Sequence, residues 1–271
     1  MKKTDNTFTP AFGLKNGHLQ TLYPAFFRKC KPLNMDIETF ELDDGDFVQC
    51  HWVNQPEKNS NTPIVVLFHG LEGSYKSPYI QGMMHALDHS GYSCVLMHFR
   101  GCSGKINRQP RAYHSGDTAD ARAWIENLTK RFELNPLFGI GYSLGGNMLL
   151  KLLGEWKKDS PFKAAVSISA PMQLDISANT INKGFSKIYQ RHLLEHLKFS
   201  LVQKYQYHDM KKLIGMDEND VRNIPTIWAF DDLYTAKIHG FQTAKNYYKC
   251  SSAKQYVKDI QTPTLIIHAL D

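Results

Sequence analysis

A pentapeptide at residues 141–145, GYSLG, constrains the fold of this chain more than any other feature, because the hydrophobic pattern changes across it. The apolar residues 136–140 before it predict a short buried strand, and residues 147–153 after it predict a helix. A serine at such a junction lies on a tight, strained turn, where only small neighbours avoid collision with the strand. We therefore predict that Ser143 exposes a nucleophilic hydroxyl at a helix N-terminus, whose unpaired N–H groups favour negative charge. An ordinary glycine-rich turn is the alternative.

The composition is that of an ordinary globular protein. The 271 residues are 42% hydrophobic and 21% charged, enough for one large domain with a substantial core. The net charge of +6 is spread along the chain, which predicts mild attraction to anionic surfaces and no nucleic-acid partner. No run approaches the ~18 apolar residues of a membrane helix, so we expect at most peripheral membrane contact.

The cysteines and the N-terminal residues favour a cytoplasmic location. The five cysteines are scattered, odd in number and without C-x-x-C spacing, which predicts reduced thiols. Residues 1–7 are basic but lack the apolar stretch of a signal peptide.

Hydrophobic periodicity along the chain predicts alternating strands and helices. Residues 36–42 and 47–53 alternate on either side of a polar turn and predict a hairpin. Further strands are predicted at 64–68, 94–97, 137–140, 164–168 and 264–268, with helices at 79–90 and 117–132. This order predicts an α/β fold with a mostly parallel sheet and an antiparallel edge.

We predict a single domain over residues 1–271 with two additions to the sheet. Residues 1–35 mix aromatic, proline and basic residues and predict an irregular N-terminal arm packed on the body. Residues 174 to about 225 show no clear strand and predict a helical cap insertion.

Eight short motifs from one end of the chain to the other carry a resemblance to a known family. They are residues 17–21 (GHLQT), 69–74 (HGLEGS), 98–104 (HFRGCSG), 113–116 (YHSG), 141–147 (GYSLGGN), 230–233 (FDDL), 250–253 (CSSA) and 263–271 (PTLIIHALD). With them the chain resembles the α/β-hydrolase fold, and more closely its YheT-like branch of predicted serine esterases. The resemblance implies a serine hydrolase acting on carboxylic esters, with a Ser–Asp–His triad and neither a cofactor nor a metal.

The chemistry requires Ser143 to attack an acyl carbonyl while a base removes its proton. The tetrahedral oxyanion then needs fixed N–H donors. Leu144, directly after the nucleophile, is predicted to supply one amide. The loop 69–73 is predicted to supply the other from Leu71, and an ordinary βα turn is the alternative for this loop.

Asp271 is the candidate triad acid, because it follows the predicted strand 264–268 in the chain order Ser, Asp, His. In the resembling family this strand ends in a pair of aspartates, and Asp271 matches the first of them. A solvated carboxylate at the chain end is the alternative.

The family's histidine follows the acid by some tens of residues, after one more strand. This sequence ends before that histidine, that last strand and the final helix, so we expect an incomplete version of a longer protein with an incomplete triad. His69 and His98 follow predicted strands, but we expect them to order loops by hydrogen bonding rather than to replace the base.

Two other patterns are weaker. Residues 192–196 (HLLEH) match the H-x-x-E-H zinc pattern, but no third ligand is evident and a solvated helix face is the preferred interpretation. Asp231 and Asp232 could be paired acids, although a role at the start of a helix is preferred.

The sequence therefore predicts a serine hydrolase that cleaves carboxylic esters, including lipid acyl esters or thioesters, through an acyl-serine intermediate. Its expected partner is a small-molecule or lipid ester substrate. The rival interpretation is an inactive, truncated α/β-hydrolase remnant that binds a ligand or partner without turnover.

Overall fold

A computed structural model describes residues 9–28, 30–57 and 59–269. These residues form a seven-stranded sheet in the order β1-β2-β4-β3-β5-β6-β7. Its strands are β1 (Asp36–Glu41), β2 (Phe47–Val53), β3 (Ile64–Phe68), β4 (Ser93–Met97), β5 (Leu137–Tyr142), β6 (Phe162–Ile168) and β7 (Thr264–Ile267). β2 pairs antiparallel with β1 and β4, and all the other pairs are parallel. The predicted mostly parallel α/β sheet with an antiparallel hairpin is confirmed.

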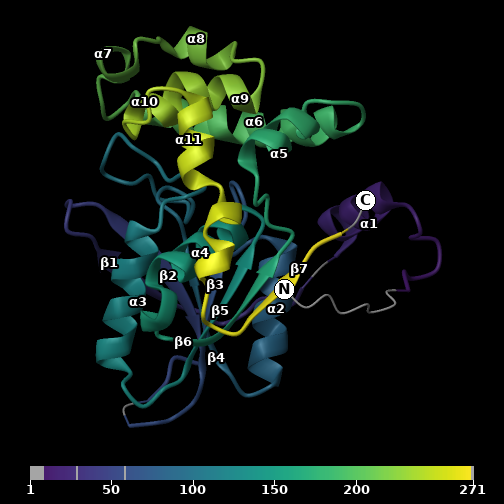
Figure 1. Cartoon of the computed structure of the whole chain (residues 1–271), viewed down its shortest axis with the longest axis vertical. Coiled ribbons are helices and arrows are strands. Elements are labelled where there is room, and N and C mark those ends of the chain that lie inside the picture. The colour runs from purple at the N-terminus through teal and green to yellow at the C-terminus, as the bar shows by residue number, and fades with distance from the viewer. Residues whose placement is uncertain (1–8, 29, 58, 270–271) are drawn as a thin grey trace.

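Helices cover both faces of this sheet (Figure 1). They are α2 (Pro78–His89), α3 (Ala119–Arg131) and α4 (Leu144–Trp156). Successive residues of a strand point to opposite faces, so Val66 and Phe68 pack in one cluster with α3 and α4 while Val65 and Leu67 pack with α2. Coverage on both sides explains why the central strands are continuous apolar runs rather than alternating ones.

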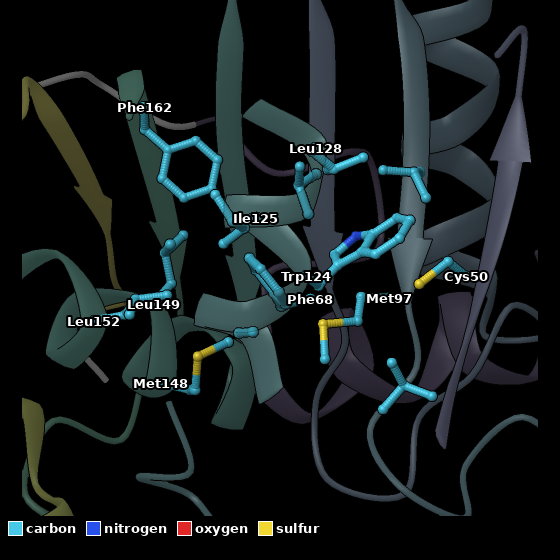
Figure 2. Packing of buried hydrophobic residues seen from close by; sticks show 14 of the residues in the cluster. Cys50, Phe68, Met97, Trp124, Ile125, Leu128, Met148, Leu149, Leu152 and Phe162 are labelled. Atoms are coloured by element: carbon cyan, nitrogen blue, oxygen red, sulfur yellow. The ribbon is translucent and has the colours of Figure 1, made fainter. Parts of the chain in front are cut away.

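The larger cluster lies between the sheet and the helices α3 and α4 (Figure 2). Phe68 and Met97 from the sheet meet Trp124 from α3 and Met148 from α4, and all four side chains are fully buried. Burial of one such side chain contributes roughly 1.5–3 kcal/mol. This packing fixes α4 against β5, and the GYSLG turn joins these two elements.

The N-terminal segment differs from its prediction. Helix α1 spans Gly17–Phe27, where an irregular arm was expected. The signal was a stripe of large apolar residues spaced by four, Leu19, Tyr23 and Phe27, which is the spacing of one helical face. No helix within the described ranges is long and apolar enough to cross a membrane.

A layer of helices lies beyond the carboxyl ends of the parallel strands, and we refer to it as the cap helices (Figure 1). They are α5 (Leu174–Ile181), α6 (Ser186–Lys204), α7 (Met210–Ile214), α8 (Glu218–Arg222), α9 (Ile227–Phe230), α10 (Ala236–Ile238) and α11 (Ala244–Ser251). Residues 174–225 are helical as expected, and helices continue to Ser251 before the chain returns to β7. The cap helices have an apolar cluster of their own, which includes Leu201, Met210 and Phe230.

Candidate active site

Ser143 lies in a sharp turn between β5 and α4. Its backbone has a φ of +49° and a ψ of −117°, a region that residues other than glycine rarely adopt. The Ser143 N–H donates to the Ile168 carbonyl at 2.8 Å, and the Ser143 side chain is exposed. The predicted strand-to-helix turn is present, and the strain is held by hydrogen bonds to the neighbouring strand and helix.

The two flanking glycines are required by close contacts within the turn. A Cβ on Gly141 would lie 2.5 Å from the carbonyl oxygen of Gly145. A Cβ on Gly145 would lie 2.5 Å from the carbonyl oxygen of His69. Because both neighbours are backbone atoms, neither can move away without shifting the turn.

The loop after β3 packs directly on this turn. The Gly145 N–H donates to the His69 carbonyl at 3.1 Å, and a Cβ on Gly70 would lie 3.2 Å from the Cβ of Ser143. The Gly70 N–H is held by the Tyr79 hydroxyl at 2.9 Å. These contacts hold the loop beside the serine.

Leu71 and Leu144, the predicted oxyanion donors, line the same cavity as Ser143. Within the described part of the chain, neither of their amide N–H groups donates to a protein acceptor. Leu144 is the first residue of α4, where an unpaired N–H is expected. Two unused backbone donors therefore border the cavity at Ser143.

His69 and His98 order loops, as expected. The Phe99 N–H donates to Nε2 of His69 at 3.1 Å, and the Tyr75 N–H donates to Nε2 of His98 at 3.1 Å. Burial lowers the pKa of His69 to about 4 and the pKa of His98 to about 2, so both imidazoles are neutral at pH 7. With both Nε2 atoms engaged, neither ring is available to take a proton from Ser143.

The other two triad positions are not completed by the described residues. Asp271, the predicted acid, lies outside them. Ser143 Oγ makes no hydrogen bond with any described residue, and His114 is the one described histidine that lines the cavity. Its Nδ1 accepts the Gly116 N–H at 3.1 Å, and burial lowers its pKa to about 3.

Asn147 links three of the sequence motifs, a role that sequence reasoning missed. Its Nδ2 donates to the carbonyls of Ser115 and Ser251, both at 2.8 Å, and its Oδ1 accepts the Ala253 N–H at 2.9 Å. Asn147 is fully buried in α4, directly after the serine turn. The YHSG and CSSA segments, far apart in the sequence, are therefore attached to the helix that follows the Ser143 turn.

The cavity above Ser143 has a volume of about 520 Å³ and lies between the sheet and the cap helices. Apolar side chains dominate its wall on the cap side: Leu174, Ile181, Leu193, Leu197, Ile227 and Phe230. Polar residues also line the cavity, Glu72, Lys204 and Asp231 among them, but the surface that faces it is mostly apolar. This volume and this lining are typical of a small-molecule site with an apolar ligand group.

Asp231 and Asp232 do not begin a helix, so the preferred interpretation of this pair is wrong. Their helical run starts at Ile227, and both lie in a π-helical turn that follows α9. Asp231 accepts the Tyr248 hydroxyl at 2.7 Å, and burial raises its pKa to about 6. Asp232 accepts the Ala244 N–H at 2.7 Å instead, so the two carboxylates serve different partners.

His192 and His196 are exposed on α6, and Glu195 between them pairs with Lys198 at 3.0 Å. These contacts agree with a solvated helix face.

A second group, His114, Asp117 and His239, has ligand atoms within 4.8 Å of one another. However, Nδ1 of His114 accepts a backbone N–H, whereas a metal-bound imidazole donates from its second nitrogen. Asp117 is already paired with Arg111 at 3.1 Å. These contacts disfavour a metal ion between the three side chains.

Comparison with known proteins agrees with this geometry. The alpha/beta hydrolase fold family matches residues 63–271. The Escherichia coli protein named "Putative esterase YheT" is 43% identical over 97% of this chain and 77% of that protein. The Homo sapiens protein named "Phospholipase ABHD3" is 27% identical over 98% of this chain and 65% of that protein. The solved structure of Est1E from Butyrivibrio proteoclasticus has a TM-score of 0.51 at 14% identity, over 86% of this chain and 76% of that one, and supports the fold alone.

Proposed function

Since the chain belongs to the α/β-hydrolase family, we propose that it is a serine hydrolase that cleaves carboxylic esters through an acyl-serine intermediate. The observation that carries the proposal is the strained turn that exposes Ser143 to a cavity bordered by two unused backbone N–H groups. Strained backbone conformations cluster at functional sites, and a serine that served only packing would not need a φ of +49°.

In the proposed reaction, Ser143 Oγ attacks the carbonyl carbon of the ester as a base takes its proton. The negative charge that develops on the carbonyl oxygen is stabilised by the N–H groups of Leu144 and Leu71. Loss of one such donor typically costs about 3 kcal/mol of transition-state stabilisation. The base returns this proton to the alcohol oxygen as the ester C–O bond breaks, and the alcohol leaves. It then takes a proton from water, which attacks the acyl-serine, releases the carboxylic acid and regenerates the Ser143 hydroxyl.

We propose Asp271 as the triad acid from its position in the sequence, shortly after β7, the parallel strand that pairs with β6. In the resembling family the base is a histidine that follows this acid along the chain. The acid would hold the imidazole in the tautomer that accepts the serine proton.

The apolar wall of the cavity supports an acyl ester with an apolar chain, which is the chemistry of a lipid ester. The name of the human relative, a phospholipase, supports the same class. A cavity of about 520 Å³ accommodates an acyl chain as well as the reacting carbonyl.

The second candidate is binding without turnover. It is favoured by one observation, that no described histidine hydrogen-bonds to Ser143. In that case the cavity would hold an acyl ligand while Ser143 remained unreactive.

A fluorophosphonate probe tests the proposal on the protein expressed as its full natural chain. We expect one labelled peptide, carrying Ser143, and no labelling of the Ser143→Ala variant. Hydrolysis of p-nitrophenyl esters of increasing chain length should accompany it. Absence of both labelling and hydrolysis, with retained binding of a fluorescent fatty acid, would establish the second candidate instead.

A further inference from the structure

Glu72 occupies a strained position next to the predicted oxyanion donor Leu71. Its φ is +51°, in the left-handed region that residues with a side chain rarely adopt. Such a conformation is unfavourable and persists only where its surroundings hold it. Glu72 lines the cavity, so the contacts that hold it also border the site.

Tyr113 holds Glu72 from the sheet side. The Tyr113 hydroxyl accepts the Glu72 N–H at 2.8 Å and donates to Glu72 Oε1 at 2.9 Å. Tyr113 is itself buried and stacks on Phe99, with ring centroids 5.0 Å apart and planes 12° from parallel. The position of Glu72 relative to the sheet is therefore fixed through a rigid aromatic side chain.

Ser200 holds Glu72 from the cap side. Its hydroxyl, on α6, donates to Glu72 Oε2 at 2.8 Å. Among the described residues, this is the one hydrogen bond that joins the loop 69–73 to the cap helices. No described cation lies within ion-pair distance of the Glu72 carboxylate, and among the described residues its hydrogen bonds come from the Tyr113 and Ser200 hydroxyls.

We propose that Glu72 is a positioning residue that couples the cap helix α6 to the oxyanion loop. One carboxylate oxygen accepts from Tyr113 and the other from Ser200 on α6. The Leu71 N–H is therefore correctly placed only while α6 packs against the loop 69–73. The inference rests on the proposed function, in which the Leu71 N–H stabilises the oxyanion. Its effect falls on the rate of the chemical step rather than on the affinity for substrate.

The test compares Glu72→Gln and Ser200→Ala with two matched controls on α6, using the full natural chain and a short p-nitrophenyl ester. Glu195→Gln makes the same charge change on an exposed residue that does not line the cavity. Ser186→Ala removes a hydroxyl at the other end of the same helix. We expect kcat to fall about 10- to 100-fold for Glu72→Gln and about 5- to 10-fold for Ser200→Ala, a part of the loss for a missing oxyanion donor. KM should change less than about twofold, and the controls should match wild type.

Two further variants separate positioning from simple stability. Ser200→Thr keeps the hydroxyl and should restore kcat. The double variant Glu72→Gln with Ser200→Ala should lose no more than Glu72→Gln alone, because both changes break the same link. If Glu72→Gln does not fold, the comparison of Ser200→Ala with Ser200→Thr tests the coupling by itself.

The outcomes distinguish this inference from the proposed function. If wild type is labelled at Ser143 and hydrolyses esters while Ser200→Ala keeps the wild-type kcat, the coupling is refuted and the function stands. If kcat falls equally in Ser200→Thr and Ser200→Ala, the hydroxyl is irrelevant and the coupling is refuted. If wild type is neither labelled nor active, the function fails and this inference fails with it.

Discussion

The sheet region and the cap helices build the candidate site in different ways. At the sheet, backbone atoms dominate: the Ser143 turn, the carbonyl of His69 and the N–H groups of Leu71 and Leu144. On the cap side, side chains dominate, with an apolar wall and a few polar residues. In the proposed function, the sheet region carries the chemistry and the cap helices select the acyl chain.

The two regions also differ in how they are held. The central strands β3 and β4 are fully buried in clusters that span the sheet and its helices. The cap helices form a separate cluster and meet the sheet region through a small set of hydrogen bonds, such as those of Asn147, Lys204 and Ser200. Elements joined through few contacts move more readily, so we expect the cap helices to move more than the sheet region.

The largest effect is expected for Ser143→Ala. If chemistry resides in the sheet region, kcat for any ester should fall about 10⁴-fold or more, because the acyl intermediate of the proposed reaction forms on the Ser143 hydroxyl. The melting temperature should not fall, since the hydroxyl makes no hydrogen bond with a described residue. Steady-state kinetics with a calorimetric scan measures both, and residual turnover near wild type would contradict the assignment.

Asn147→Ala tests the hydrogen bonds that attach the cap helices to the sheet region. It leaves the carbonyls of Ser115 and Ser251 and the N–H of Ala253 without their partner, at a cost of about 2–4 kcal/mol in the free energy of unfolding. Asn223→Ala, on the exposed surface of the cap, is the matched control and should change stability by less than about 0.5 kcal/mol. If urea titrations give equal free energies of unfolding for the two variants, the hydrogen bonds of Asn147 do not contribute to stability.

Selection by the cap is probed by Leu197→Ala. The shortened side chain enlarges the cavity, so KM for long-chain p-nitrophenyl esters should rise about 10-fold, while kcat/KM for the acetate should stay within about twofold. Leu213→Ala, an exposed cap leucine outside the cavity, is the control. If kcat/KM falls equally for the short and the long ester, the cap helices do not select by chain length and the proposed division of roles is wrong.

The smallest effect concerns the pH dependence of Lys204, a buried cap residue whose ammonium donates to Asn107 and to the Gln109 carbonyl. Burial lowers its pKa to about 8, from an ordinary value of 10.5. Between these values the folded chain has released a proton that the unfolded chain still holds, so stability should rise with pH. The slope from this group is at most about 1.4 kcal/mol per pH unit between pH 8 and pH 10. Lys204→Met should flatten the rise in urea titrations over this range, and an unchanged slope would contradict it.

Local patterns predicted much of the molecule from the sequence. The hairpin, the buried strands and the turn at Ser143 each depend on residues within about ten positions of one another, so periodicity and glycine placement reveal them. The same logic failed at Gly17–Phe27, where a helical stripe lay among proline and basic residues and an irregular arm was predicted. It also misplaced Asp231 and Asp232, because the helical run already begins at Ile227, where the Thr226 hydroxyl accepts the Ala229 N–H.

By itself, the sequence determined the strand order along the chain, the turn at Ser143 and the family, because each depends on short-range spacing or on short motifs. Only the tertiary structure decided which distant groups meet: Asn147 with Ser251, Glu72 with Ser200, and the cap leucines with the cavity at Ser143. The physical reason is that these contacts join residues tens of positions or more apart. Which residues meet depends on how the chain packs in three dimensions, and this packing produces no periodic pattern in the sequence.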